Sequence, residues 1–319
     1  MFDKVASAHF ASSGDPVLDR RYEWARAAFD EGDAAAAAEI LDQTVAQAYG
    51  FLAAWHLFGL AQEALGRHEE AATAWRHCLD LDADDRLGAK LDLARIGALP
   101  AEEATSAAFS GALFDSYAER FDDHLTQSLH YNAPALLHKA LRTCCDNAGR
   151  PFRFATVYDL GCGTGLMGEV LREAATFLAG CDLSAGMVAR AEAKRGAGAL
   201  PLYDKLAVAE LTDFLASRPD GAADLVVAAD VFVYLGELRP VLMQSARVLA
   251  PGGLLAFTVQ SHEGEGVMVG EDRRFAHAQG WLRERVEEAN FRILTFDPVS
   301  TRQDRGVPVP GFLAVAERR

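Results

Sequence analysis

Three glycines directly after an apolar strand form the most informative chemical pattern in the chain. Gly161, Gly163 and Gly165 follow the stretch that ends at Asp159, and a helix is expected close behind them. Glycine permits a tight turn and lets a ligand approach the backbone where a Cβ would collide. The start of the helix adds N–H groups and the positive end of a dipole. The segment therefore predicts a site for a nucleotide-like cofactor.

The spacing of the glycines distinguishes between kinds of cofactor. A dinucleotide-binding turn is spaced G-x-G-x-x-G/A, which would place glycine or alanine where this chain has Leu166. Asp182 lies 21 positions after Gly161, at the end of the next expected strand. A carboxylate there can accept hydrogen bonds from both hydroxyls of a ribose. The pattern favours a nucleoside cofactor that is not a dinucleotide.

A later segment completes the pattern and carries a resemblance to a family. Residues 249–253 read L-A-P-G-G and turn an expected helix into an expected strand. With the D-x-G-x-G-x-G segment at 159–165, the chain resembles the class I S-adenosylmethionine (SAM) dependent methyltransferases over about residues 112–319. The resemblance implies SAM as cofactor and S-adenosylhomocysteine as product. It also implies an α/β fold with a seven-stranded, doubly wound sheet, consistent with the alternation of strands and helices after Arg153.

The resemblance places cofactor-binding side chains at the carboxyl ends of successive strands. Asp182 would hold the ribose, and Asp230 would lie beside the transferred methyl. Met187 and Leu211 would contact the adenine ring, and Glu210 its amino group. A structural role remains open for Met187 in the core and for Glu210 as a charge before the helix expected at 212–217. The full implied set is Asp159, Gly161, Cys162, Gly163, Gly165, Asp182, Leu183, Met187, Glu210, Leu211, Asp230 and Tyr117.

Tyr117 joins this set through a segment upstream of the glycines. Residues 114–122 resemble the lid that many small-molecule methyltransferases fold over the cofactor. Apolar residues at helical spacing, among them Tyr117 and Phe121, form one face of an expected helix. Plain core packing is the alternative for both aromatic side chains.

The implied reaction determines which further groups are needed. Transfer from a sulfonium is an in-line displacement, so the protein chiefly aligns the reactants and excludes water. A general base is required only for a protonated acceptor. Tyr234, His262 and His277 are predicted as catalytic, with Tyr131 as a further candidate, and Arg273 or Arg274 could clamp a carboxylate. No His, Cys and Asp spacing indicates a zinc site, so no metal is predicted.

The first third of the chain has a different periodicity. Gly32 and Gly66 fall 34 positions apart, each in a short link between expected helices, and Ala37 and Ala71 occupy matching places. The second copy, with Trp75, resembles a tetratricopeptide (TPR) repeat. Two repeats are close to the minimum for independent stability. Docking of a protein partner, self-association, and a cap that orders the enzyme remain open as roles.

The composition of the chain limits which binding partners and which cellular compartment are expected. A net charge of −15 and a pI near 5.0, without a dense Lys/Arg run, disfavour nucleic acid and anionic membranes. No apolar run approaches the ~20 residues of a membrane span, and the first residues lack the order of a signal peptide. The five cysteines form no C-x-x-C pair, which fits a reducing compartment. The expected location is cytoplasmic.

These observations combine into one prediction with two alternatives. Four segments are expected: a flexible start at 1–18, TPR-like repeats at 19–99, linker and lid helices at 100–150, and a methyltransferase domain at 151–319. The expected activity is methyl transfer to an O, N or C nucleophile of a small molecule. A scaffold protein with an idle SAM-sensing domain is one alternative, and a protein methyltransferase that docks its substrate through the repeats is the other. An NAD(P) oxidoreductase conflicts with Leu166 and with residues 249–253.

Overall fold

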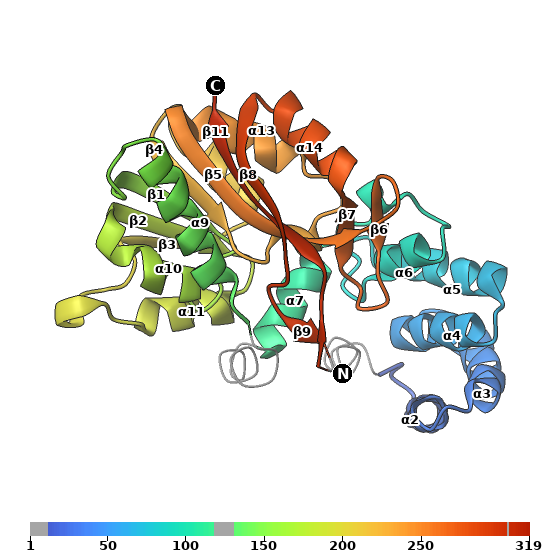
Figure 1. The fold of residues 1–319 in the computed structure, drawn as a ribbon. Coiled ribbons are helices and arrows are strands. Elements are labelled where there is room, and N and C mark those ends of the chain that lie inside the picture. The colour runs from blue at the N-terminus through green and yellow to red at the C-terminus, as the bar shows by residue number, and fades with distance from the viewer. Residues whose placement is uncertain (1–11, 118–130, 305) are drawn as a thin grey trace. The chain divides into compact units, whose positions relative to one another are not determined.

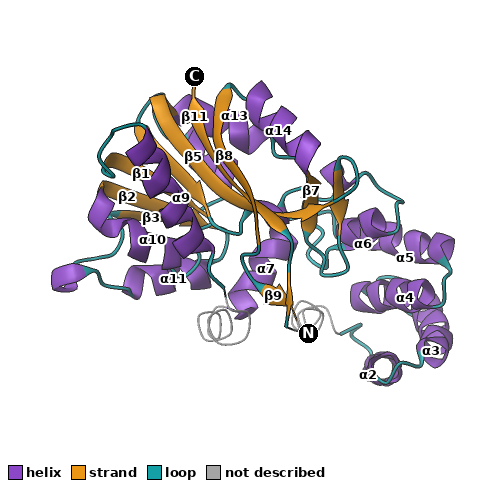
Figure 2. Cartoon of the chain, in the orientation of Figure 1, coloured by secondary structure: helices purple, strands orange, loops and turns teal. Residues whose placement is uncertain are grey.

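The computed structural model describes residues 12–117, 131–304 and 306–319, and the side chain of Tyr117 lies outside this description. Contacts divide the chain into two compact units, Met1–Ser116 and Tyr117–Arg319, here called the helical unit and the sheet unit. Figure 2 shows that the described strands all belong to the sheet unit. The four segment boundaries expected from the sequence stay a prediction. Within the described ranges, no helix combines the length and apolar character needed to cross a membrane.

The helical unit consists of successive helices that pack on their neighbours in the sequence. They are α2 (Pro16–Asp30), α3 (Ala34–Gln47), α4 (Leu52–Ala64), α5 (His68–Leu81), α6 (Ala89–Arg95), the 3₁₀ turn η2 (Ala101–Glu103) and α7 (Ala107–Tyr117). Asp15 and Asp33 cap α2 and α3 by accepting backbone N–H bonds. Gly32 and Gly66 take positive φ in the links, as the repeat predicted.

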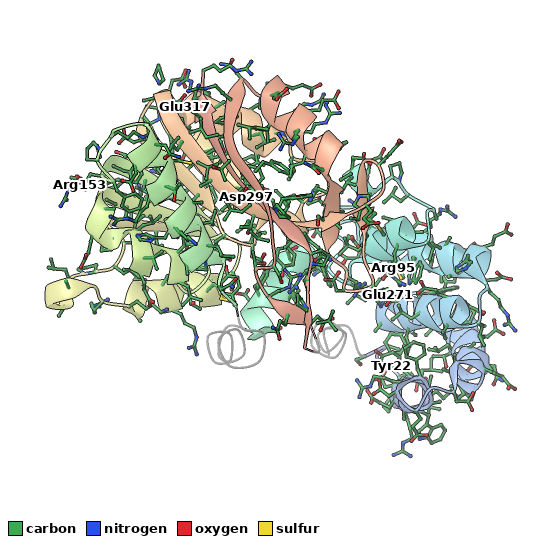
Figure 3. The ribbon with its side chains drawn as sticks, viewed as in Figure 1. Tyr22, Arg95, Arg153, Glu271, Asp297 and Glu317 are labelled. Carbon is green, nitrogen blue, oxygen red and sulfur yellow. The ribbon has the colours of Figure 1, made fainter. Side chains whose placement is uncertain are left out.

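Small residues let these helices approach closely. Ala37 and Ala71 are fully buried, and a Cβ on Gly59 would lie 2.2 Å from Nε1 of the buried Trp75. Figure 3 labels Tyr22, which packs on Phe51 with ring centroids 5.2 Å apart. The side chain of Trp75 therefore packs closely against α4 at Gly59, whereas the assignment of these helices as TPR-like repeats stays a prediction.

The sheet unit is built on one mixed sheet with the main order β3-β2-β1-β4-β5-β11-β8, visible in Figure 1. Neighbours from β3 to β5 run parallel, and β11 runs antiparallel to both β5 and β8. The strands are β1 (Phe154–Leu160), β2 (Ala175–Asp182), β3 (Lys205–Val208), β4 (Ala223–Ala228), β5 (Leu249–His262), β6 (Val267–Val269), β7 (Phe275–Ala278), β8 (Phe291–Val299) and β11 (Gly311–Arg318), with the separate pair β9 (Gln303–Asp304) and β10 (Val307–Pro308). The main path has the seven strands that the resemblance implied, and β6 and β7 extend the sheet.

Helices cover both faces of the sheet, as the alternating pattern predicted. Apolar residues of α9 (Ala133–Asn147), α10 (Leu166–Leu171) and α11 (Ala185–Ala193) form one core with strand residues such as Val157. Those of α12 (Leu211–Ala216), α13 (Arg239–Val248) and α14 (Gln279–Glu288) form the other with Tyr158. Short 3₁₀ turns complete the unit: η5 (Arg172–Ala174), η6 (Ala197–Ala199) and η7 (Phe232–Tyr234). Because side chains alternate along β1, Val157 and Asp159 lie on the face of α9, α10 and α11.

Candidate cofactor and acceptor site

The glycine turn connects the end of β1 to α10. Gly161, Gly163 and Gly165 have φ of +59°, +52° and +96°, which non-glycine residues rarely adopt. A Cβ on Gly161 would lie 2.6 Å from Cγ2 of Val231, and one on Gly165 would lie 3.1 Å from Cε2 of Tyr203. Two of the three glycines are thus required by backbone conformation and by packing against the protein. The sequence suggested the tight turn and the approach of a ligand, but not the packing of Val231 and Tyr203 against the glycines.

Asp182 joins the turn to the end of β2. Its Oδ2 accepts the N–H of Gly163 at 2.9 Å and its Oδ1 accepts the N–H of Ser184 at 2.9 Å. The side chain lies among the buried residues, 8% exposed. A carboxylate oxygen can accept more than one hydrogen bond. Both oxygens of Asp182 thus bind backbone N–H groups, and a further bond to a ribose hydroxyl stays a prediction.

Residues expected around an adenine lie at the ends of β2 and β3, which are adjacent in the sheet. Leu183 is partly exposed, whereas Met187 is fully buried and Leu211 nearly so. Strand β3 ends at Val208, and Glu210 caps α12 instead of extending the strand. Its Oε2 accepts the N–H and the hydroxyl of Thr212 at 2.7 and 2.6 Å. This is the capping role left open above, and contact of Glu210 with an adenine stays a prediction.

Asp159 lies beneath the turn and is 1% exposed. Its Oδ2 accepts the hydroxyl of Tyr203 at 2.6 Å. Burial raises the pKa of Asp159 to about 7, while the bond from Tyr203 opposes this rise. Burial also raises the pKa of the Cys162 thiol in the turn well above its ordinary value. Sequence reasoning missed Tyr203. The glycines at 165, 168 and 180 were the available signal, because residues without a side chain leave room for a large ring.

Asp230 follows β4 and has a positive φ of +61°. Its carboxylate accepts the hydroxyl of Thr301 at 2.9 Å and the Nη1 of Arg302 at 2.8 Å. Arg302 is 3% exposed, and its Nη2 donates to Gln260 at 2.8 Å. Sequence reasoning missed Thr301 and Arg302 because they lie about seventy positions away with no pattern to mark them. The acid expected beside the methyl is thus held by the connection between β8 and β11.

The predicted catalytic side chains occupy different settings. The hydroxyl of Tyr234 accepts a hydrogen bond from Nε of Arg274 at 3.1 Å, and the guanidinium lies 5.5 Å from the ring centroid. His262 contacts its own turn, with Nδ1 3.1 Å from the N–H of Gly264. Tyr131 donates to the carbonyl of Ala229 at 3.2 Å, directly before Asp230.

His277 is fully buried in β7, with Nε2 3.0 Å from the carbonyl of Leu235. Burial lowers its pKa to about 4, so the ring is neutral at pH 7. The roles of His277, His262 and Tyr234 in catalysis stay predictions. The lid roles of Tyr117 and Phe121 also stay predictions, since both side chains lie outside the described residues.

Comparison with known proteins agrees with this geometry. Residues 158–257 match the family model of a methyltransferase domain. The chain is 32% identical over 157 residues to malonyl-[acyl-carrier protein] O-methyltransferase of Salmonella typhimurium, covering 49% of this chain and 53% of that protein. It is 28% identical over 143 residues to a ubiquinone biosynthesis O-methyltransferase of Maricaulis maris, covering 43% and 55%. The chain thus spans about half the length of the curated relatives it matches.

A solved SAM-dependent methyltransferase from Methanosarcina mazei is 17% identical, with a TM-score of 0.44, and covers 54% of this chain and 96% of that one. The strand order and the matched segment agree on the fold: the sheet unit has the α/β Rossmann-like fold of class I SAM-dependent methyltransferases.

Proposed function

We propose that this protein is a SAM-dependent methyltransferase that acts on a small-molecule acceptor. The observation that carries the proposal is the arrangement of Asp182, whose two carboxylate oxygens bind the glycine turn and the start of α11 at the edge where β1 and β2 end. In open α/β sheets, ligands bind outside the carboxyl ends of the strands. The matched methyltransferase domain spans this edge and agrees with SAM as the cofactor.

When bound, SAM supplies an activated methyl group on a sulfonium, and the chain's own residues orient it. Asp182 would hold the ribose hydroxyls, and Leu183 and Leu211 would contact the base. Asp230, fixed by Arg302 and Thr301, forms part of the wall beside the acceptor. Such a site accelerates methyl transfer because it aligns the nucleophile with the methyl group and excludes water.

The acceptor atom is proposed from the relatives. Both curated relatives are named O-methyltransferases, which favours an oxygen nucleophile among the O, N and C acceptors considered. A hydroxyl acceptor must lose its proton during transfer, so a base has a use. Tyr234 and His262 remain candidates for that base, and His277 would need to exchange a proton from a fully buried position.

The exposed aromatic side chains of the helical unit support a protein as an alternative acceptor. Trp24 and Tyr49 are 59% and 66% exposed, and Tyr49 packs on His77 with ring centroids 4.1 Å apart. TPR-like repeats that dock a protein would use such surface aromatics. A scaffold protein whose SAM-binding domain is idle would share this surface but would transfer no methyl group.

The test is calorimetric titration of the full chain with SAM, S-adenosylhomocysteine and NADH. We expect micromolar binding of the first two and none of NADH. Asp182→Asn, which keeps the size of the side chain, should weaken this binding at least tenfold, and Asp297→Asn on the exposed edge of β8 serves as the control. A folded wild-type protein that binds neither SAM nor its product would refute the proposal.

A further inference from the structure

The ring of Tyr203 fills a slot whose walls are glycines. Tyr203 lies shortly before β3 and is 5% exposed. A Cβ on Gly168 would lie 2.4 Å from its hydroxyl oxygen, and one on Gly180 would lie 3.0 Å from its Cε1. With Gly165, at 3.1 Å from Cε2, these positions belong to the turn, α10 and β2. One aromatic ring therefore sets the spacing of three elements around the glycine turn.

The hydroxyl of this ring reaches the acid that precedes the turn. Asp159 lies two positions before Gly161, on the sheet face that packs against α9, α10 and α11 together with Tyr203. The 2.6 Å bond from Tyr203 to Oδ2 is short, as expected for a hydroxyl that donates to a carboxylate. On the other side of the turn, Asp182 accepts the N–H of Gly163. Asp182 thus binds the turn directly, whereas Asp159 precedes the turn in β1 and is oriented by Tyr203.

The charge on Asp159 depends on this bond. The pKa of Asp159 is raised to about 7: burial raises it most, the hydrogen bond from Tyr203 lowers it, and the charge of Asp182 on β2 raises it. Other titratable groups near Asp159 are Cys162 in the turn and Tyr131 before α9, whose pKa values are both raised in part by Asp159. In this buried environment, the hydrogen bond from Tyr203 favours the ionised form of Asp159.

We propose that Tyr203 is a positioning residue of the cofactor site, which acts through Asp159 to hold the glycine turn in its ligand-binding conformation. The inference rests on the proposed function, because SAM or its product is the ligand that the turn would bind. Tyr203 itself does not need to touch the ligand: it sets the spacing of α10 from β2 with its ring and the charge of Asp159 with its hydroxyl.

A neighbouring tyrosine provides a matched control. Tyr158 is adjacent to Asp159 in β1, is 4% exposed, and points to the opposite face, where it packs edge-on against Phe214 at 5.7 Å. Tyr158→Phe and Tyr203→Phe each remove the phenol oxygen of a tyrosine that is at most 5% exposed and leave the ring. Only the second change removes a bond to the acid before the turn.

The experiment titrates full-length wild type, Tyr203→Phe and Tyr158→Phe with S-adenosylhomocysteine between pH 6 and 8.5. At pH 7 we expect Tyr203→Phe to weaken binding about tenfold and Tyr158→Phe to stay within about twofold. Wild-type affinity should rise with pH as Asp159 ionises. Removing the donor raises the pKa of Asp159 further, so this rise should move to higher pH in Tyr203→Phe alone.

A second comparison tests whether Tyr203 acts through Asp159. In an Asp159→Asn background, Tyr203→Phe should cause no further loss of affinity, because the carboxylate that it orients is gone. Equal losses in both backgrounds would overturn the inference. So would a Tyr203→Phe profile that overlays the wild type at every pH, even with a lowered melting temperature. If folded wild type binds no S-adenosylhomocysteine at any pH, the proposed function fails as well; a failure of this inference alone leaves wild-type binding intact.

Discussion

Buried charged side chains have different roles in the two units. In the helical unit, the fully buried Asp92 on α6 lies 2.9 Å from Nε2 of His56 on α4 and 3.3 Å from Arg95, which also pairs with Glu63. Figure 3 labels Arg95 within this unit. This network joins one helix to another through side chains of opposite charge. Such a network specifies how the helices pack, and breaking one partner leaves a buried charge without compensation.

In the sheet unit, three acids instead converge at one edge of the sheet. Asp159 is the penultimate residue of β1, Asp182 ends β2 and Asp230 lies two positions after β4. Their partners include a phenol, two backbone N–H groups and one guanidinium. Their bonds hold the loops that surround the strand ends. The contrast teaches that the location of a buried acid matters more than its burial: acids gathered at strand ends indicate a site.

The largest expected effect breaks the ion pair between Arg302 and Asp230, just after β4. Arg302→Met leaves Asp230, whose side chain is 14% exposed, without its cation, and we expect it to cost about 3 kcal/mol of unfolding free energy, measured by denaturant titration. Adding Asp230→Asn should recover much of this loss, because no charge is then left unpaired. A loss as large in the double variant as in the single one would contradict the pairing.

A backbone contact tests the helical unit separately. Gly59→Ala places a Cβ 2.2 Å from the buried Trp75 and should cost about 1–3 kcal/mol, seen in thermal unfolding. Gly50→Ala, where nothing lies within 4 Å, is the control and should change little. Affinity for S-adenosylhomocysteine should remain unchanged in Gly59→Ala. Weakened binding would show that the site depends on the packing of the helical unit.

The pH dependence of stability compares one buried acid from each unit. Burial raises the pKa of Asp85 to about 6 and that of Asp159 to about 7, above the ~3.9 of an unfolded Asp. Each carboxyl therefore binds its proton more tightly in the folded state than in the unfolded state. Its contribution to stability is full below pH ~4 and is lost as the pH rises through 6 and 7. Asp85→Asn and Asp159→Asn should each reduce that decline, by on the order of 2 kcal/mol, in denaturant titrations between pH 4 and 8. If stability declines with pH as steeply in both variants as in the wild type, other titratable groups cause the decline.

The smallest effect is expected at the surface of the sheet unit. Arg292, 63% exposed, pairs with Glu317 at 2.5 Å near the end of β11, where Figure 3 labels Glu317. Solvent screens this pair, so Arg292→Met should cost less than about 1 kcal/mol. The same denaturant titration that measures Arg302→Met would detect a larger value. Comparable losses at the two arginines would remove the distinction between a buried and a surface pair.

The sequence by itself determined the elements that local patterns encode. Alternating strands and helices predicted the sheet, the left-handed turn required glycines at 161, 163 and 165, and strand endings placed Asp182 and Asp230 at one edge. The links at Gly32 and Gly66 were likewise marked by residues that suit a positive φ. These features depend on residue type and short spacing, so they are visible without coordinates.

Only the tertiary structure decided which side chains hold those acids. Tyr203 reaches Asp159 across 44 positions and Arg302 reaches Asp230 across 72, and neither has a periodicity that points to its partner. It also decided that Glu210 caps a helix and that His277 is fully buried against the carbonyl of Leu235. Such contacts depend on how strands and connections meet in space, because a hydrogen bond is set by distance and direction rather than by separation along the chain.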